Sequence, residues 1–125
     1  MKPTILIIDD ELDMVRVMTV RFKASGYEVI TAGDGNTAYG KAKSDAPDLI
    51  ILDLMLPGMD GYQVCRLLKF DEKYRRIPII MLTAKGQKED KEWGEKVGAD
   101  FYMAKPFEAK ELLSKIKELS EGRNA

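Results

Sequence analysis

Short apolar runs alternate with longer segments of mixed polarity along this chain. The apolar runs lie at residues 4–8, 27–31, 49–52, 77–82 and 101–103. Those at 5–8, 49–52 and 79–82 are almost wholly apolar, a pattern typical of strands buried on both faces of a parallel sheet. The run at 27–31 alternates apolar and polar residues, which predicts an edge strand.

Segments of helical character separate these runs and follow the last one. We predict helices over residues 11–25, 34–45, 60–71, 87–97 and 108–121. Val64, Leu67 and Leu68 fall on one stripe of the third helix, and Gly26 stands where a glycine commonly ends the first. Repeated strand–helix units predict an α/β fold: a doubly wound, flavodoxin-like sandwich with a five-stranded parallel sheet in the order 2-1-3-4-5.

The length of the chain, 125 residues, fits one compact domain. We expect this domain over residues 1–121, with a short disordered tail over 122–125. The single cysteine, Cys65, excludes an internal disulfide and fits a reducing compartment. The first apolar run is cut off by Asp9 and is too short for a signal peptide or a membrane span, so we expect a cytoplasmic protein.

Composition narrows the chemistry that the chain can perform. The 20 basic and 21 acidic residues give a net charge of −1, so bulk charge does not point to a nucleic-acid or membrane surface. The chain has no histidine, which removes histidine nucleophiles, histidine general bases and histidine-ligated zinc. Any reaction must therefore use carboxylates, lysine, threonine and main-chain groups.

Chemically complementary residues follow the predicted strands at the point where each strand ends. Asp9 and Asp10 follow the first strand, and Asp53 follows the third. Thr83 and Lys105 follow the fourth and fifth. Because all strand C-termini of a parallel sheet meet at one edge, where ligands bind, we expect these side chains to converge on one crevice.

Clustered carboxylates repel one another unless a cation lies between them. Mg²⁺ prefers oxygen ligands in near-octahedral geometry, which suits this set. We predict Asp10 and Asp53 as direct ligands, Asp9 as a direct or water-mediated one, and the backbone carbonyl of Met55 as a further one.

A metal flanked by Lys105 and Thr83 suits phosphoryl transfer, because the charge of a moving phosphoryl group spreads over three oxygens. Mg²⁺, Lys105 and Thr83 would each meet one of them. Asp53 lies centrally among the strand ends and is the predicted nucleophile, forming an acyl phosphate.

Simpler roles account for each residue taken alone. Asp9 or Asp10 could cap the helix that follows, and Asp53 could be a turn residue. Thr83 and Lys105 could be ordinary strand-end residues. Their coincidence at the same edge of the sheet favours the shared site.

Four motifs resemble the receiver domain of bacterial two-component response regulators, of the single-domain chemotaxis type, over nearly the full length. They are "IIDDE" (7–11), "DLIILDLMLPGMDGYQV" (48–64), "IPIIMLTAK" (77–85) and "GADFYMAKPF" (98–107). The resemblance implies that Asp53 accepts a phosphoryl group from a phosphohistidine of a sensor histidine kinase or phosphotransfer protein, with Mg²⁺ at Asp9, Asp10, Asp53 and Met55. It also implies that Thr83 swings toward the phosphoryl group, that Tyr102 moves inward with it, and that the Lys105–Pro106 bond is usually cis.

We expect two surface regions to take part in phosphoryl transfer and switching. The predicted helix over 87–97 is interrupted by glycine and has little apolar surface, so it suits a switch element, although a solvated surface helix is the alternative. On the first helix, Val17 and Val20 fall off the face that Met18 and Phe22 share. They suggest a docking surface for a kinase, or else scattered surface apolar residues.

We therefore expect a phosphoacceptor signalling domain that acts only on itself, not a turnover enzyme. An electron carrier of this fold would need a phosphate-binding loop after the first strand, where "DDELDM" stands. A phosphatase with an aspartate nucleophile would need an acid at position 55, which is Met. A pseudo-receiver that binds partners without phosphorylation is the main alternative. The output is either a downstream effector protein or a C-terminal domain of a longer chain.

Overall fold

The computed structural model describes residues 2–84 and 98–124. Five strands form one parallel sheet in the order β2-β1-β3-β4-β5, as predicted. Their bounds are β1 Thr4–Ile8, β2 Glu28–Ala32, β3 Leu49–Asp53, β4 Ile79–Ala84 and β5 Phe101–Lys105. The helices in the described part are α1 Leu12–Ala24, α2 Gly35–Asp45, α3 Gly61–Lys69 and α5 Ala109–Asn124. The predicted helix over 87–97 lies outside the described residues.

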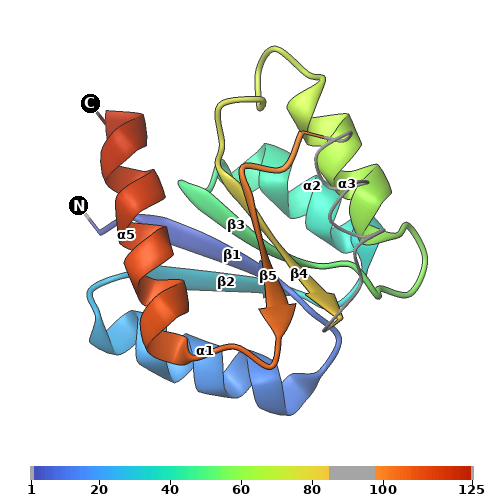
Figure 1. Ribbon diagram of the computed structural model, residues 1–125. Coiled ribbons are helices and arrows are strands. Elements are labelled where there is room, and N and C mark those ends of the chain that lie inside the picture. Colours follow the sequence, from blue (N-terminus) through green and yellow to red (C-terminus); the bar gives the residue numbers. More distant parts are fainter. Residues whose placement is uncertain (1, 85–97, 125) are drawn as a thin grey trace.

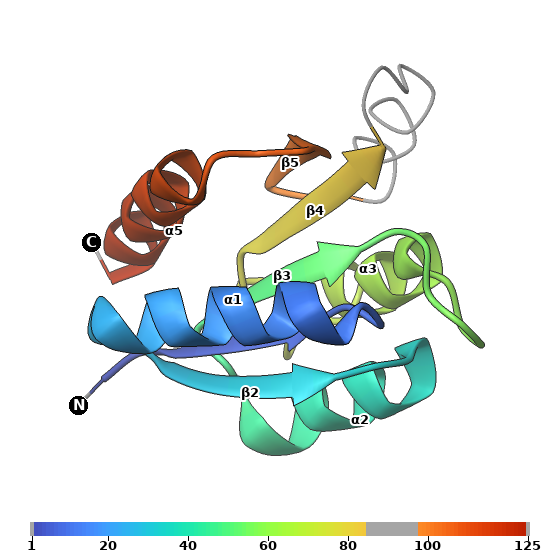
Figure 2. The ribbon, with the colours of Figure 1, turned by 90° about the horizontal axis from the view of Figure 1, so that it is seen from below.

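Helices cover both faces of the sheet, which explains why its inner strands are apolar on both sides. α1 and α5 lie on one face, and α2 and α3 lie on the other (Figures 1 and 2). Alternate residues of β1 and β3 enter two separate cores: Leu6 and Ile50 pack toward α2 and α3, whereas Ile7 and Ile51 pack with Phe22 of α1. β2 is an edge strand with several half-buried residues, as its alternating sequence predicted.

Local sequence signals set several element ends. Asp60 begins α3 with a capping box, in which its carboxylate accepts the amide hydrogen of Gln63 and the Gln63 side chain accepts that of Asp60. Gly26 follows α1 with a φ of 95°, the left-handed conformation expected of a C-terminal glycine stop. Asp60 and Gly26 thus set where α3 begins and where α1 ends, and so where the adjoining loops end and start.

Some element bounds differ from the predictions because ladder hydrogen bonds continue past the apolar runs. Thr83 pairs with Ala104 and Ala84 pairs with Lys105, so Thr83 and Lys105 lie within β4 and β5 instead of following them. Asp53 pairs with Leu82 and is likewise the last residue of β3 instead of following it. α5 continues to Asn124, beyond the end expected at residue 121, because polar residues can extend a helix without an apolar stripe. In the described part of the chain, no helix is long and apolar enough to cross a membrane.

Candidate functional site

Asp53 is the last residue of β3, at the edge of the sheet where all strands end. Its neighbours across the sheet are the ends of β1 and β4, with Leu82 as its register partner. Only 4% of Asp53 is exposed, although a charged side chain ordinarily stays in water. A buried carboxylate at the crossover point between β1 and β3 is therefore the centre of the candidate site.

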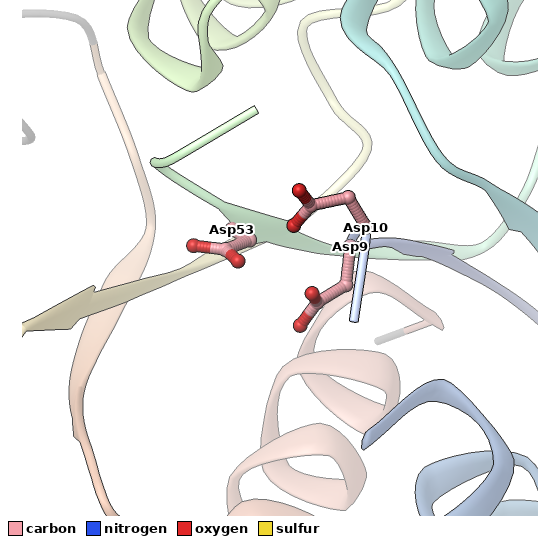
Figure 3. Close-up of side chains that lie close together, drawn as sticks. All are labelled: Asp9, Asp10 and Asp53. Carbon is pink, nitrogen blue, oxygen red and sulfur yellow. The ribbon is translucent and has the colours of Figure 1, made fainter. Parts of the chain in front are cut away.

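Two further carboxylates meet Asp53 from the end of β1. Asp9 is 2% exposed, whereas Asp10 is exposed, and one carboxylate oxygen from each of the three residues lies within 4.8 Å of the others. Figure 3 shows the three side chains gathered where β1 and β3 end. The topology thus brings residues 9 and 53 together as the sequence predicted, and the oxygen-rich set fits a hard divalent cation.

Lys105 supplies positive charge to this cluster. Its Nζ lies 3.1 Å from Oδ2 of Asp53 and 3.4 Å from Oδ2 of Asp9. Burial alone would lower the pKa of Lys105, but its hydrogen bond to Asp53 and the nearby negative charges outweigh burial and raise that pKa. The ammonium group therefore stays charged at neutral pH.

Burial is the main reason why the pKa of Asp9 is raised, and the charge of Asp53 raises it further. Lys105 and a hydrogen bond from the backbone N–H of Glu11 act in the opposite direction. A cation placed between Asp9 and Asp53 would relieve this repulsion. The donor set and its electrostatics thus both suit bound Mg²⁺.

Main-chain hydrogen bonds fix the orientation of the two buried carboxylates. The Glu11 amide donates to Oδ1 of Asp9 at 2.9 Å, and the Met55 amide donates to Oδ1 of Asp53 at 3.1 Å. In both residues the other oxygen, Oδ2, faces Lys105. The carboxylates are therefore held in place before any ligand binds.

Met55 lies in the loop between β3 and α3, and its side chain is exposed. A thioether is a poor ligand for Mg²⁺, so only the backbone carbonyl of this residue suits the predicted role. The loop folds back on itself, with the amides of Leu56 and Gly61 both donating to the carbonyl of Leu54. Met55 is thereby kept at the rim beside Asp53.

The two residues of the expected switch, Thr83 and Tyr102, lie on the paired strands β4 and β5. Thr83 is 8% exposed and follows Leu82, the register partner of Asp53. Tyr102 is half-buried in β5, opposite Met81. The Lys105–Pro106 peptide bond is cis, as the resemblance implied.

Sequence reasoning gave no site role to Glu11, whose Oε1 lies 3.5 Å from Nζ of Lys105. The signal was present, because Glu11 is the third acid of the run that includes Asp9 and Asp10. Its side chain is 63% exposed, so this ion pair is weak compared with those of the buried carboxylates.

Comparison with known proteins gives consistent matches to one family. The family model described as "Response regulator receiver domain" matches residues 5–117. The alkaline phosphatase synthesis transcriptional regulatory protein PhoP of Bacillus subtilis is 44% identical over 119 residues, which cover 95% of this chain and 49% of PhoP. The chain spans about half the length of the curated relatives it matches.

Solved structures agree with these matches. A putative response regulator from Chloroflexus aurantiacus has a TM-score of 0.92 and 36% identity, covering 97% of this chain and 99% of that one. The receiver domain of the sensor histidine kinase PA1611 from Pseudomonas aeruginosa has a TM-score of 0.88 and 32% identity, covering 97% and 99%. Its crystal structure is described as holding a magnesium ion coordinated in the active site cleft.

Proposed function

The chain belongs to the response regulator receiver domain family, and on that premise we propose that it is a phosphorylation-dependent switch with Asp53 as its phosphoacceptor. The observation that carries the proposal is the position of Asp53: a buried carboxylate among two further acids, with Lys105 3.1 Å away. It is a signalling domain that acts on itself and not on a small substrate. Its cysteine, Cys65, is buried and forms no disulfide within the described residues, which suits the reducing cytoplasm in which we expect the protein to act.

Asp9, Asp10, Asp53 and the carbonyl of Met55 would hold Mg²⁺. When bound, the ion offsets negative charge on the carboxylates and on the incoming phosphoryl oxygens. The magnesium described for the PA1611 receiver domain supports this assignment, as does the clustering of three carboxylates here.

The proposed reaction is the transfer of a phosphoryl group from a phosphohistidine to Asp53. An oxygen of the Asp53 carboxylate attacks phosphorus, a P–O bond forms, the P–N bond breaks, and the imidazole leaves with the bonding electron pair. Lys105 Nζ already faces Oδ2 of Asp53 and would pair with a phosphoryl oxygen. The hydroxyl of Thr83 would donate to another.

The phosphoryl group would switch the surface of β5 and α5, together with the predicted segment 87–97, which lies outside the described residues. Thr83 precedes that segment and pairs with β5, while Tyr102 lies within β5, so both connect the site to this surface. Hydrogen exchange over residues 84–103 with and without a phosphoryl mimic tests the idea. Equal protection in both states would refute it.

The exposed apolar side chains of α1 support a docking surface for the kinase or phosphotransfer protein. Val17 is 56% exposed and Val20 is 68% exposed, whereas Met18 and Phe22 of the same helix are buried. Leu12, at the start of α1 beside the acidic site, is also exposed. An apolar helix face next to the phosphoacceptor suits the helices of a phosphodonor protein.

The output lies in a downstream effector or in a further domain. Relatives about twice as long, including PhoP, are named as transcriptional regulatory proteins, which favours an output domain beyond the receiver. A pseudo-receiver that works without phosphorylation is the competing candidate. The presence of Asp53, Thr83 and Lys105 disfavours it.

Intact-mass analysis after incubation with acetyl phosphate and Mg²⁺ tests the proposed function. We expect the parent protein to gain one phosphoryl group, and Asp53→Ala to gain none. Asp45→Ala, at the exposed end of α2, is the control and should behave like the parent. A parent protein that gains no mass would instead support the pseudo-receiver.

A further inference from the structure

The first turn of α2 touches the β3–α3 loop at Met59, in the same loop as Met55. Gly35 begins α2, and a Cβ atom built on it would lie 1.8 Å from the carbonyl oxygen of Met59 and 2.6 Å from the Met59 carbonyl carbon. An ordinary van der Waals contact of a Cβ atom is 3.4 Å or more. Only glycine at position 35 therefore allows the first turn of α2 to lie this close to the loop.

The α2 side of this contact is rigid. The carboxylate of Asp34 accepts hydrogen bonds from the backbone N–H of Thr37 at 2.8 Å and from its hydroxyl at 2.9 Å. These bonds lower the pKa of Asp34 and fix the first turn of the helix. The amide of Gly35 then points to the carbonyl of Pro57, at 3.4 Å.

The loop side of the contact is short and is fixed at both of its ends. At the start, the Met55 amide donates to Asp53. At the end, Gly61 packs so closely that a Cβ atom there would lie 2.7 Å from the carbonyl oxygen of Asp53. The part of the loop between Met55 and Gly61 contains Met59, so the contact with Gly35 limits its remaining freedom.

We propose that Gly35 is a positioning residue for the magnesium site, acting through Met59 and the β3–α3 loop on the main chain of Met55. This inference rests on the proposed function, because it assumes that Mg²⁺ binds at Asp9, Asp10 and Asp53. A side chain at position 35 must displace either the loop or α2, because the two nearest atoms that it meets are the backbone carbonyl oxygen and carbon of Met59. The Met55 carbonyl then loses its place relative to the carboxylates.

The direct test compares Gly35→Ala with Gly40→Ala. Gly40 lies in the same helix, and a Cβ atom there would meet nothing within 4 Å. We expect Gly35→Ala to weaken Mg²⁺ binding about tenfold in calorimetric titration, as loss of a supporting residue around a metal site typically does. It should also shift the amide resonances of Met55 and Leu56 in the metal-free protein, whereas Gly40→Ala should match the parent in both measurements.

A second pair of variants keeps the test decisive if Gly35→Ala does not fold. Asp34→Ala removes the cap that holds Gly35 in place, and Asp34→Asn removes the same charge but keeps a capping side chain. We expect about threefold weaker Mg²⁺ binding for Asp34→Ala and parental binding for Asp34→Asn.

The outcomes separate this inference from the proposed function. If the parent binds Mg²⁺ and a folded Gly35→Ala binds it equally well with unshifted loop amides, the inference is wrong. If Gly35→Ala does not fold, equal Mg²⁺ affinity of Asp34→Ala and Asp34→Asn overturns the inference instead. A parent that binds no Mg²⁺ contradicts the proposed function itself.

Discussion

Nζ of Lys105 lies 3.1 Å from Oδ2 of Asp53, although 52 residues separate them in the sequence. The same ammonium group lies 3.4 Å from Oδ2 of Asp9. Two nearly buried carboxylates thus face one cation, and the metal-free site depends on Lys105 to offset their charge.

Lys105→Met should destabilise the metal-free domain by about 2 kcal/mol, because it leaves Asp9 and Asp53 buried without a cation. Urea unfolding measures this difference, with Lys110→Met, an exposed lysine, as the control. Saturating Mg²⁺ should narrow the gap between variant and parent, because it supplies charge to the same carboxylates. If Mg²⁺ leaves the difference in free energy of unfolding between variant and parent unchanged, Lys105 and the metal do not offset the charge of the same carboxylates.

Val17→Glu should slow phosphoryl transfer from the cognate kinase about tenfold or more, because it places a charge in the proposed docking surface. Phosphorylation by acetyl phosphate should not change, since this small donor needs no docking. Phe70→Glu is the matched control: Phe70 is 71% exposed and directly follows α3, a helix that lies on the opposite face of the sheet from α1 (Figure 1). Equal kinase rates for both variants would refute the docking surface.

Lys69→Met should lower the free energy of unfolding by about 3 kcal/mol. Nζ of Lys69 lies 2.5 Å from Oδ2 of Asp100 and donates to the carbonyls of Arg75 and Ile77, so the substitution leaves three acceptors without this donor. These contacts connect the end of α3 to the segments that precede β4 and β5. Thermal or urea unfolding measures this loss of free energy of unfolding. Lys73→Met, which replaces an exposed lysine, is the control and should lose little stability. Similar losses in both variants would argue against the network around Lys69.

Burial raises the pKa of the Cys65 thiol from its ordinary 9.0 to about 12. Between these values the unfolded chain ionises the thiol while the folded domain keeps it protonated, so the free energy of unfolding falls as pH rises. The difference between the parent and Cys65→Ala should therefore shrink by up to about 1.4 kcal/mol per pH unit above pH 9. At pH 8 a thiol reagent should label Cys65 only as fast as the domain unfolds, and immediate labelling of the folded protein would contradict this.

The sequence predicted the sheet order and the meeting of Asp9 with Asp53, because buried parallel strands and right-handed crossovers leave few arrangements. It did not predict that Asp53, Thr83 and Lys105 lie within strands, because ladder hydrogen bonds extend past the apolar residues that mark a strand in sequence. The end of α5 was missed for a related reason: polar residues give no stripe from which to read its last turn.

The contact between Gly35 and Met59 could not be predicted from the sequence. A glycine at the start of a helix has several ordinary explanations, and the close approach depends on how α2 and the β3–α3 loop pack in three dimensions. The ion pair of Glu11 with Lys105 also depends on the position of β5, which a local pattern does not give. Topology was therefore more predictable than contacts between loops.

Reductive trapping tests most directly whether Asp53 carries the phosphoryl group at a magnesium-dependent site. Borohydride converts an aspartyl phosphate to homoserine, so peptide mass mapping after acetyl phosphate treatment locates the acceptor. We predict homoserine at position 53 when Mg²⁺ is present and unmodified Asp53 when the metal is chelated. Homoserine at Asp9 or Asp10, or equal conversion of Asp53 without metal, would contradict the account.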